Sequence, residues 1–360
     1  MSEASDPWFG LDRAFEFQIA ASRALGSDFS ALVMRVVLDD VHAGGPFAAL
    51  VEPWAGWDAG RLIAAAAPLR LLGGLHYLVL SGAAPALAAE FPAARPRTDA
   101  EALRRRIAEA GVEHAARLAE FSRSPPQTNE VRRSLCLIGG FLTLARETGL
   151  PLRCLEIGAS AGLNLNWDRY RYDLGALGGW GDPASPVTIG GEWEGAAAPF
   201  DVKAEVAERA GCDRAPIDLS DPDQALRLEA YVWADQADRL ARLRGAVALA
   251  RRFPPPIAAM DAGVWALETA RPKPGMASVL YHSVVWSYLS DETRAAIQDS
   301  VRIAGESASA DAPFAWLRME PSMAGASGAM EVRLTTWPGG VERGLARVHP
   351  HGAKVLWLGA

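Results

Sequence analysis

The chain has 360 residues, of which 50% are hydrophobic and 22% are charged. Such a chain can build one large core and a second module, and its composition excludes disorder over most of its length. The formal net charge of −7 argues against duplex nucleic acid as a partner, because a nucleic-acid binder needs a basic surface.

Cysteine use and the apolar segments bear on where the protein works. Cys136, Cys154 and Cys212 are far apart in sequence and form no Cys-x-x-Cys pair, which predicts neither a disulfide framework nor a zinc site. The N-terminal residues lack the basic and apolar pattern of a signal peptide. The most apolar segment, Leu69 to Leu80, is too short to span a bilayer. We therefore expect a soluble cytoplasmic protein without a metal, membrane or nucleic-acid partner.

Residues 1–150 are predicted to form an all-helical N-terminal domain. Apolar side chains recur at helical spacing over four segments, 15–25, 29–41, 61–80 and 99–121. A fifth helix is expected to start near Thr128, with Thr128 or Asn129 as its N-cap, and to stop before Gly149 and Pro151.

Residues 151–360 are predicted to form an α/β domain. Short apolar runs bounded by Gly, Pro and Asp alternate with helices at 222–252 and 291–305, which is typical of a mostly parallel sheet. The last three strands have no helix between them, so that end of the sheet is expected to be antiparallel. A region rich in Gly, Pro and aromatic residues, 168–199, is expected to be an insertion. The predicted strands are 152–157, 203–213, 256–260, 278–282, 314–320, 331–337, 345–349 and 354–358.

The most informative segment is the glycine loop that follows the first strand. Glu156 precedes a turn flanked by Gly158 and Gly162, and the turn is expected to open a helix whose free N–H groups could bind a carboxylate or phosphate. A glycine turn also serves simply to pack a strand against a helix. A phosphate-binding P-loop would end in Gly-Lys-Ser/Thr, and a dinucleotide fingerprint would have a glycine at Ser160, so neither pattern fits well.

Further short motifs accompany this loop across almost the whole chain. They are Gln127–Glu130, Leu155–Asn164, Arg169–Tyr172, Gly181–Pro183, Pro216–Asp218, Tyr281–Trp286 and His351–Gly352. In these motifs the sequence resembles a bacterial family of unknown function with a methyltransferase-like core. More widely, it resembles class I S-adenosylmethionine-dependent methyltransferases. The resemblance implies a Rossmann-like core and S-adenosylmethionine as the cofactor.

The resemblance also implies roles for individual residues. Asp213, with Asp218 as the second choice, would end the second strand and take the ribose hydroxyls, and Asp261 would end the third strand near the adenine. The alternative is that these aspartates only cap loops. The insertion lengthens the unit between the first two strands beyond the usual ~30 residues, which leaves the register of the second strand open. The residues expected to frame the methionine end are Glu156, Gly158, Ser160 and Gly162.

One histidine is the candidate catalytic residue. His282 ends the predicted strand 278–282, which in the methyltransferase pattern ends beside the transferable methyl group, and a neutral imidazole there could remove a proton from the acceptor. A histidine satisfied by a backbone carbonyl is the competing interpretation. The candidate substrate-binding residues are Asn129, Glu130, Trp286 and Tyr288. For these, helix capping and core packing are the alternatives.

The sequence thus predicts an S-adenosylmethionine-dependent methyltransferase that acts on a small molecule. No Asn-Pro-Pro-Tyr or Asp-Pro-Pro-Tyr motif occurs, which argues against a DNA methyltransferase of exocyclic amines. A nicotinamide- or flavin-dependent oxidoreductase and a non-catalytic ligand-binding protein on the same scaffold are the alternatives. The methyl acceptor and the oligomeric state stay open.

Overall fold

The computed structural model of the protein describes residues 8–94, 97–322 and 330–359. Its contacts divide the chain into two compact units. The helical unit comprises Met1–Thr128 and Asp221–Ala241, and the sheet unit comprises Asn129–Ser220 and Arg242–Ala360. The sequence suggested a division at residue 150. The structure differs because the helix that follows Thr128 packs on the sheet, and because a later segment of chain returns to the helical unit.

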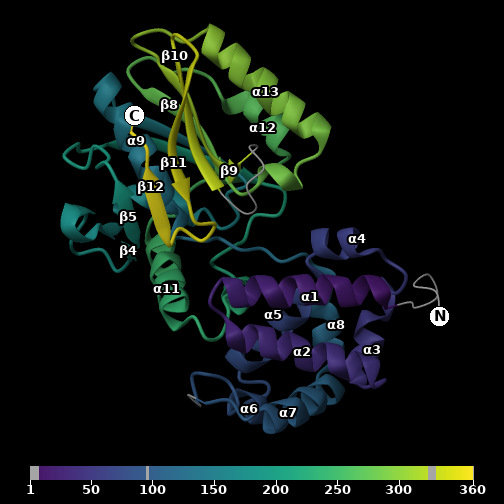
Figure 1. The fold of residues 1–360 in the computed structure, drawn as a ribbon. Helices are drawn as coiled ribbons and strands as arrows, with labels where there is room; N and C mark the ends of the chain where they lie inside the picture. The colour runs from purple at the N-terminus through teal and green to yellow at the C-terminus, as the bar shows by residue number, and fades with distance from the viewer. Residues whose placement is uncertain (1–7, 95–96, 323–329, 360) are drawn as a thin grey trace. The chain divides into compact units, whose positions relative to one another are not determined.

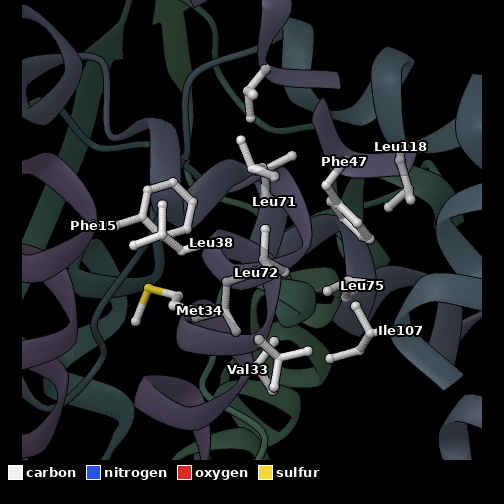
Figure 2. Packing of buried hydrophobic residues seen from close by; sticks show 14 of the residues in the cluster. Phe15, Val33, Met34, Leu38, Phe47, Leu71, Leu72, Leu75, Ile107 and Leu118 are labelled. Atoms are coloured by element: carbon white, nitrogen blue, oxygen red, sulfur yellow. The ribbon is translucent and has the colours of Figure 1, made fainter. Parts of the chain in front are cut away.

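Apolar residues from successive helices form the core of the helical unit. Phe15 of α1, Val33 of α2 and Leu75 of α5 are fully buried in one cluster (Figure 2). Side-chain caps fix where several helices begin, as where Ser27 accepts a hydrogen bond from the Ser30 amide. The elements are α1 Phe9–Ala24, α2 Asp28–His42, α3 Pro46–Val51, η2 Glu52–Trp54, α4 Ala59–Ala64, α5 Ala67–Leu80, α6 Pro85–Ala88, α7 Ala100–Glu113, α8 Ala115–Arg123 and α10 Pro222–Ala230.

The predicted helix over 61–80 is divided in the structure. Ala66 has a φ of +51°, and this left-handed residue separates α4 from α5. Within the described residues one helical stretch, Ala59–Leu80, is long and apolar enough to cross a membrane by length and composition. It is weak evidence for a membrane span, because 56% of its most apolar window is buried inside the protein, as in a core helix.

A nine-stranded sheet forms the centre of the sheet unit, in the order β5-β12-β11-β10-β9-β8-β1-β6-β7. Neighbouring strands from β9 to β7 run parallel, and β9, β10, β11 and β12 pair antiparallel, as the sequence predicted. The strands are β1 Leu152–Ile157, β5 Glu192–Gly195, β6 Val206–Asp213, β7 Ile257–Ala259, β8 Ala277–Ser283, β9 Phe314–Pro321, β10 Met330–Trp337, β11 Val341–Val348 and β12 Lys354–Trp357.

Helices cover both faces of this sheet (Figure 1). On one face lies α9 Arg133–Thr148, where Gly139 and Gly140 let the helix approach Trp357 and Leu317 closely. On the other face lie α12 Ala262–Thr269 and α13 Asp291–Glu306. We call this side of the sheet the α13 face. The predicted helix over 222–252 is two helices, α10 and α11 Ala237–Arg252, and the division between the units falls within α11.

The insertion contains a small sheet of its own. Its strands β2 Arg171–Asp173, β3 Gly179–Gly181 and β4 Thr188–Gly190 pair in the order β3-β2-β4, next to the short helix η4 Gly175–Leu177. The strand β5 pairs parallel with β12 at the edge of the large sheet. The ring of Trp167 anchors the insertion, because it stacks on Phe141 at 4.4 Å and on Trp180 at 5.5 Å.

A helix follows the glycine turn as expected, but it is short and irregular. The segment Leu163–Arg169 is a 3-10 helix, η3, that is interrupted where Asn166 leaves the helical region. The Asn166 side chain donates to the Phe253 carbonyl oxygen at 3.1 Å and accepts from Arg209 at 3.1 Å. These contacts with distant parts of the chain hold a conformation that local sequence does not predict.

Candidate functional site

The glycine loop lies where the strand order reverses. From β1 the chain continues to β6 and β7 on one side, and then crosses to β8 on the other side. Open α/β sheets bind ligands at the carboxyl ends of the strands at such a switch point. The loop Gly158–Gly162 follows the carboxyl end of β1 directly.

Both loop glycines are required by backbone angle and by space. Gly158 has a φ of +68°, and a Cβ there would lie 2.6 Å from Val285 Cγ2. Gly162 has a φ of +70°, and a Cβ there would lie 2.6 Å from Pro255 Cγ and 2.7 Å from Ile257 Cδ1. The close approach that glycine allows is therefore used by apolar side chains of the protein itself.

Hydrogen bonds within the protein occupy several N–H groups of the loop. Ser160 N–H donates to Asp213 Oδ2 at 2.9 Å, and Leu163 N–H donates to Asn129 Oδ1 at 2.9 Å. The amides of Ala159 and Gly162 donate to the Cys212 and Ala159 carbonyl oxygens, at 2.9 and 2.7 Å. The sequence predicted free N–H groups here that could bind a carboxylate or phosphate. These four amides are not free, because each donates to an acceptor within the protein.

Two buried polar atoms of the loop region have no hydrogen-bond partner among the described residues. They are Ser160 Oγ and Asn164 Oδ1. Both residues are buried, and Ser160 is held at a φ of +54°, which is uncommon for a residue other than glycine. A buried polar atom without a partner in a folded protein calls for a water or a ligand. The glycine loop and the start of η3 therefore each carry one unused hydrogen-bonding atom beside the switch point.

The predicted cofactor aspartates end or follow the expected strands. Asp213 is the last residue of β6, and Cys212 pairs with Ile157 of β1, which settles the register that the insertion left open. Asp213 Oδ1 accepts from the Ala215 amide at 3.0 Å. Asp261 caps α12 through the Gly263 amide at 2.9 Å. Capping therefore accounts for Asp261, whereas Asp213 also contacts the glycine loop.

Glu156 lies on β1 beneath the loop and is 2% exposed. Burial raises the pKa of its carboxyl well above the usual range, although a hydrogen bond from Tyr281 Oη at 3.2 Å opposes the shift. Glu156 and Tyr281 are paired across β1 and β8. The side chain is thus enclosed in the sheet unit beneath the glycine loop.

His282 forms a dyad with a carboxylate that the sequence did not single out. His282 Nδ1 lies 2.6 Å from Glu320 Oε1, an oxygen that also accepts from the amides of Val285 at 3.1 Å and Trp286 at 3.3 Å. Because Glu320 Oε1 accepts from two backbone amides, we take it to be an acceptor towards His282 as well, which places a proton on Nδ1. In the neutral ring the other nitrogen, Nε2, is then an acceptor. This is the arrangement of an oriented general base.

A bend after β8 joins the dyad to the glycine loop. Val284 has a φ of +54°, which is unfavourable for a β-branched residue. The next residue, Val285, directs its amide to Glu320 and packs its side chain against Gly158. Non-glycine residues with positive φ thus follow both β1 and β8, at Ser160 and Val284, and strain of this kind is common at functional sites.

A cavity of about 300 Å³ lies on the α13 face beside the dyad. Its wall includes Trp286, whose ring stacks on His282 at 5.3 Å. The full lining is His282, Trp286, Gln298, Trp316, Arg318, Glu320, Pro321, Glu331 and Arg333. The volume is at the lower end of the range for small-molecule sites.

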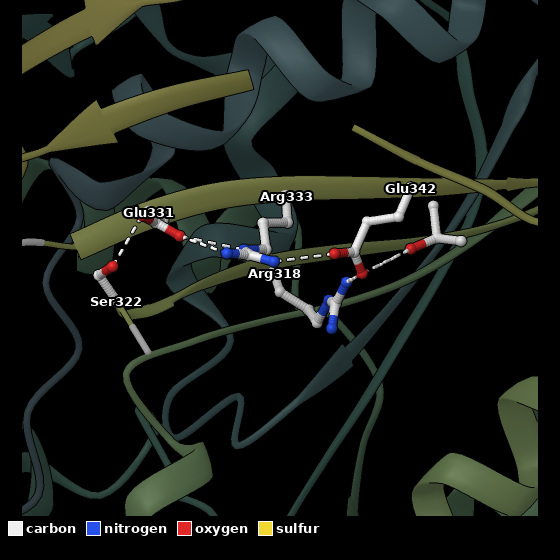
Figure 3. A network of polar contacts seen from close by, with 6 residues as sticks. Arg318, Ser322, Glu331, Arg333 and Glu342 are labelled. Carbon is white, nitrogen blue, oxygen red and sulfur yellow. Dashed lines mark hydrogen bonds and ion pairs between the residues drawn. The ribbon is translucent and has the colours of Figure 1, made fainter. Parts of the chain in front are cut away.

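Ion pairs fix the two arginines in the cavity wall (Figure 3). Arg333 bridges Glu331 at 2.8 Å and Glu342 at 2.8 Å, and Arg318 also pairs with Glu342. The Arg318 guanidinium lies 4.1 Å from the centre of the Trp316 ring. These contacts hold both cations against the sheet, so that the wall is pre-organised.

The predicted substrate residues are distributed differently from expectation. Trp286 lines the cavity with His282, whereas Tyr288 is 72% exposed and does not line it. Asn129 and Glu130 belong to the sheet unit and hold the glycine loop, through Leu163 N–H and through Asn164 Nδ2 on the Glu130 carbonyl oxygen.

Sequence reasoning missed Glu320, Trp316 and Arg318. The signal was present, because these residues alternate along one predicted strand and so share a face of the sheet. A polar face on a strand otherwise buried in the sheet is typical of a site rather than of a core.

The structure gives little support for cysteine-based or metal-based chemistry among its described residues. The three cysteines are buried free thiols, and burial raises the pKa of each to about 12, which keeps them unreactive. The described ranges contain no group of three or more His, Cys, Asp or Glu side chains that could hold a metal ion.

Comparison with known proteins gives the family of the chain. No curated protein and no solved structure matches it. A family model described as "Uncharacterized protein conserved in bacteria (DUF2332)" matches residues 12–357, and the chain therefore belongs to this bacterial family.

Proposed function

We propose that this protein is an S-adenosylmethionine-dependent methyltransferase that acts on a small molecule. The observation that carries the proposal is the glycine loop at the switch point, with the unpartnered Ser160 Oγ and Asn164 Oδ1 beside it. A ligand with several hydroxyl and amino groups would satisfy such atoms.

The strand order supports a cofactor site at this place. The five parallel strands β7-β6-β1-β8-β9 have the order 3-2-1-4-5 that is typical of Rossmann-like sheets. In the methyltransferases that the sequence resembles, the second strand ends in an acid that takes the ribose hydroxyls. Asp213 ends the second strand here, and each of its oxygens accepts one backbone N–H, which leaves acceptor capacity for a diol.

The residues fit this cofactor better than they fit a dinucleotide. A pyrophosphate needs several free N–H groups at the glycine loop, whereas four of these amides donate within the protein. Ser160 and Asp213 would hold hydroxyl or amino groups, and Gly158 and Gly162 keep the turn tight. No observation on the loop favours the nicotinamide or flavin alternative.

His282 is the proposed general base. The bound cofactor would supply an electrophilic methyl group on its sulfonium. His282 Nε2 would accept the proton that the hydroxyl or amino group of the acceptor loses as it is methylated, and Glu320 would orient the ring through Nδ1. Val285, which contacts Gly158 and Glu320, would couple the two halves of the site.

Calorimetric titration with S-adenosylhomocysteine tests the proposal. We expect one binding site in the wild-type protein, weaker binding in Ser160→Ala, and unchanged affinity in His282→Ala because that residue is assigned to the acceptor. Equal loss in both variants would remove His282 from catalysis. Binding without any methyl transfer would instead indicate a ligand-binding protein on this scaffold.

A further inference from the structure

The cavity beside the dyad has an unusual set of hydrogen-bonding atoms. Among the parts of the chain that the structure describes, four buried polar atoms of its lining residues lack a partner: His282 Nε2, Trp316 Nε1, Arg318 Nε and Glu320 Oε2. His282 is 1% exposed and Trp316 is 9% exposed, so bulk water does not satisfy them freely. Four such atoms around one cavity require a common explanation.

The four atoms are balanced between donors and acceptors. Trp316 Nε1–H and Arg318 Nε–H can only donate, whereas Glu320 Oε2 accepts. In the neutral ring His282 Nε2 also accepts, because the contacts of Glu320 Oε1 assign the single ring proton to Nδ1. A matching ligand therefore offers acceptors to the first pair and N–H or O–H groups to the second pair.

The charges around the cavity argue against an anionic ligand. Arg318 and Arg333 already pair with Glu331 and Glu342, and Glu320 adds a further carboxylate. With a neutral His282 ring, these side chains carry one more negative than positive charge. A carboxylate or phosphate ligand would meet Glu320, and both cations among the described lining residues already have carboxylate partners to offset their charge.

We propose that this cavity binds an uncharged small molecule through a group that both donates and accepts hydrogen bonds, of which a primary amide is the simplest. The carbonyl oxygen of an amide can accept from Trp316 and Arg318, and its NH₂ group can donate to Glu320 and His282. The flanking ring of Trp286 gives an apolar surface for the rest of the molecule. As a statement about the methyl acceptor this inference rests on the proposed function, but as a statement about the cavity it does not.

The test compares benzamide with benzoate, which has nearly the same shape but carries a charge and lacks donors. Binding is followed at millimolar concentration by the indole N–H resonance of Trp316, assigned by its loss in Trp316→Phe. We expect benzamide to shift this resonance and to bind at least about tenfold more tightly than benzoate. An absent shift with benzamide, or equal or tighter binding of benzoate, overturns the inference.

Glu320→Gln provides a second test that keeps the shape of the side chain. Its amide oxygen can still accept from His282, Val285 and Trp286, which leaves an NH₂ group where Glu320 Oε2 was. The variant should therefore bind benzamide more weakly and benzoate more tightly than the wild type. The matched control Glu306→Gln, at a surface ion pair with Arg302, should leave the preference unchanged. An unchanged preference in Glu320→Gln would contradict the inference.

Titration of the same samples with S-adenosylhomocysteine separates the two proposals. Cofactor binding without benzamide binding removes the inference about the cavity and leaves the proposed function. Benzamide binding without cofactor binding supports the cavity and contradicts the methyltransferase.

Discussion

Glu320 is the residue on which the geometry around the cavity depends most. One of its oxygens accepts from His282 Nδ1 and from the amides of Val285 and Trp286. These contacts orient the imidazole and hold the bend after β8, where Val284 has an unfavourable backbone conformation. The cost of such a conformation is on the order of 1–3 kcal/mol, and it persists only where surrounding contacts over-determine it.

Two substitutions of Glu320 separate these contacts from its charge. Glu320→Ala would leave buried donors of three residues unpaired, and we expect it to lower the free energy of unfolding by about 3 kcal/mol. Glu320→Gln keeps an acceptor oxygen and should cost about 1 kcal/mol or less. Urea unfolding of the two variants measures the difference. Equal destabilisation would show that the amide contacts do not hold the bend.

The glycine loop and the bend after β8 act together as one packed element. The side chain of Val285 occupies the space that a Cβ at Gly158 would need, and the Val285 amide donates a hydrogen bond to Glu320. A substitution in the glycine loop should therefore alter the packing of the bend after β8, and a substitution in the bend should alter the packing of the loop. The contact provides a physical route between the proposed cofactor site and the cavity.

Gly158→Ala tests this packing, with Gly149→Ala as a matched control. Gly149 caps α9 with nearly the same φ, +66°, but a Cβ there meets nothing within 4 Å. Both variants should lose about 1–2 kcal/mol for the left-handed conformation. Gly158→Ala should lose a further 1–3 kcal/mol, roughly, from overpacking against Val285.

A double variant measures the contact itself by chemical unfolding. Val285→Ala removes the methyl group that a Cβ at residue 158 would meet, so adding it to Gly158→Ala should recover most of the additional loss. Strictly additive effects of the two substitutions would contradict the proposed packing of the loop on the bend.

At the scale of the whole molecule, Glu156 makes stability depend on pH. Burial raises its folded pKa well above the value of about 4.3 in an unfolded chain, so the folded protein keeps a proton that the unfolded chain releases. The free energy of unfolding should therefore fall as pH rises between the unfolded and the folded pKa.

Glu156→Gln removes this titration. The stability of the variant relative to wild type should rise with pH above about 4.5, with a slope of at most about 1.4 kcal/mol per pH unit. Denaturant unfolding across that range measures it. Tyr281→Phe removes a hydrogen bond that lowers the pKa of Glu156, and should extend the decline of stability to higher pH. A difference between Glu156→Gln and wild type that does not vary with pH would contradict the account.

The sequence was a good guide to the strands. The run from Leu152 to Ile157, bounded by Pro151 and Gly158, is β1 as predicted, and the absence of helices among the last strands predicted their antiparallel pairing. Strands were predicted well because the signals used, apolar runs and the turn residues that flank them, lie within or directly beside each strand in the sequence.

What the sequence could not predict depends on partners distant in the chain. Helical periodicity marked α9 but could not show that it covers the sheet. The interrupted η3 follows from contacts of Asn166 with Arg209 and Phe253. His282 was predicted as a candidate base, but its partner Glu320 lies 38 residues away on a strand whose pairing with β8 only the fold defines.

The central claim is that the glycine loop holds S-adenosylmethionine, and calorimetric titration of the full chain with S-adenosylhomocysteine tests it most directly. The account predicts saturable binding at one site, about two- to tenfold weaker in Ser160→Ala because one hydrogen bond is lost. It also predicts a rise in thermal stability with ligand concentration. No binding heat at near-millimolar ligand would contradict the claim.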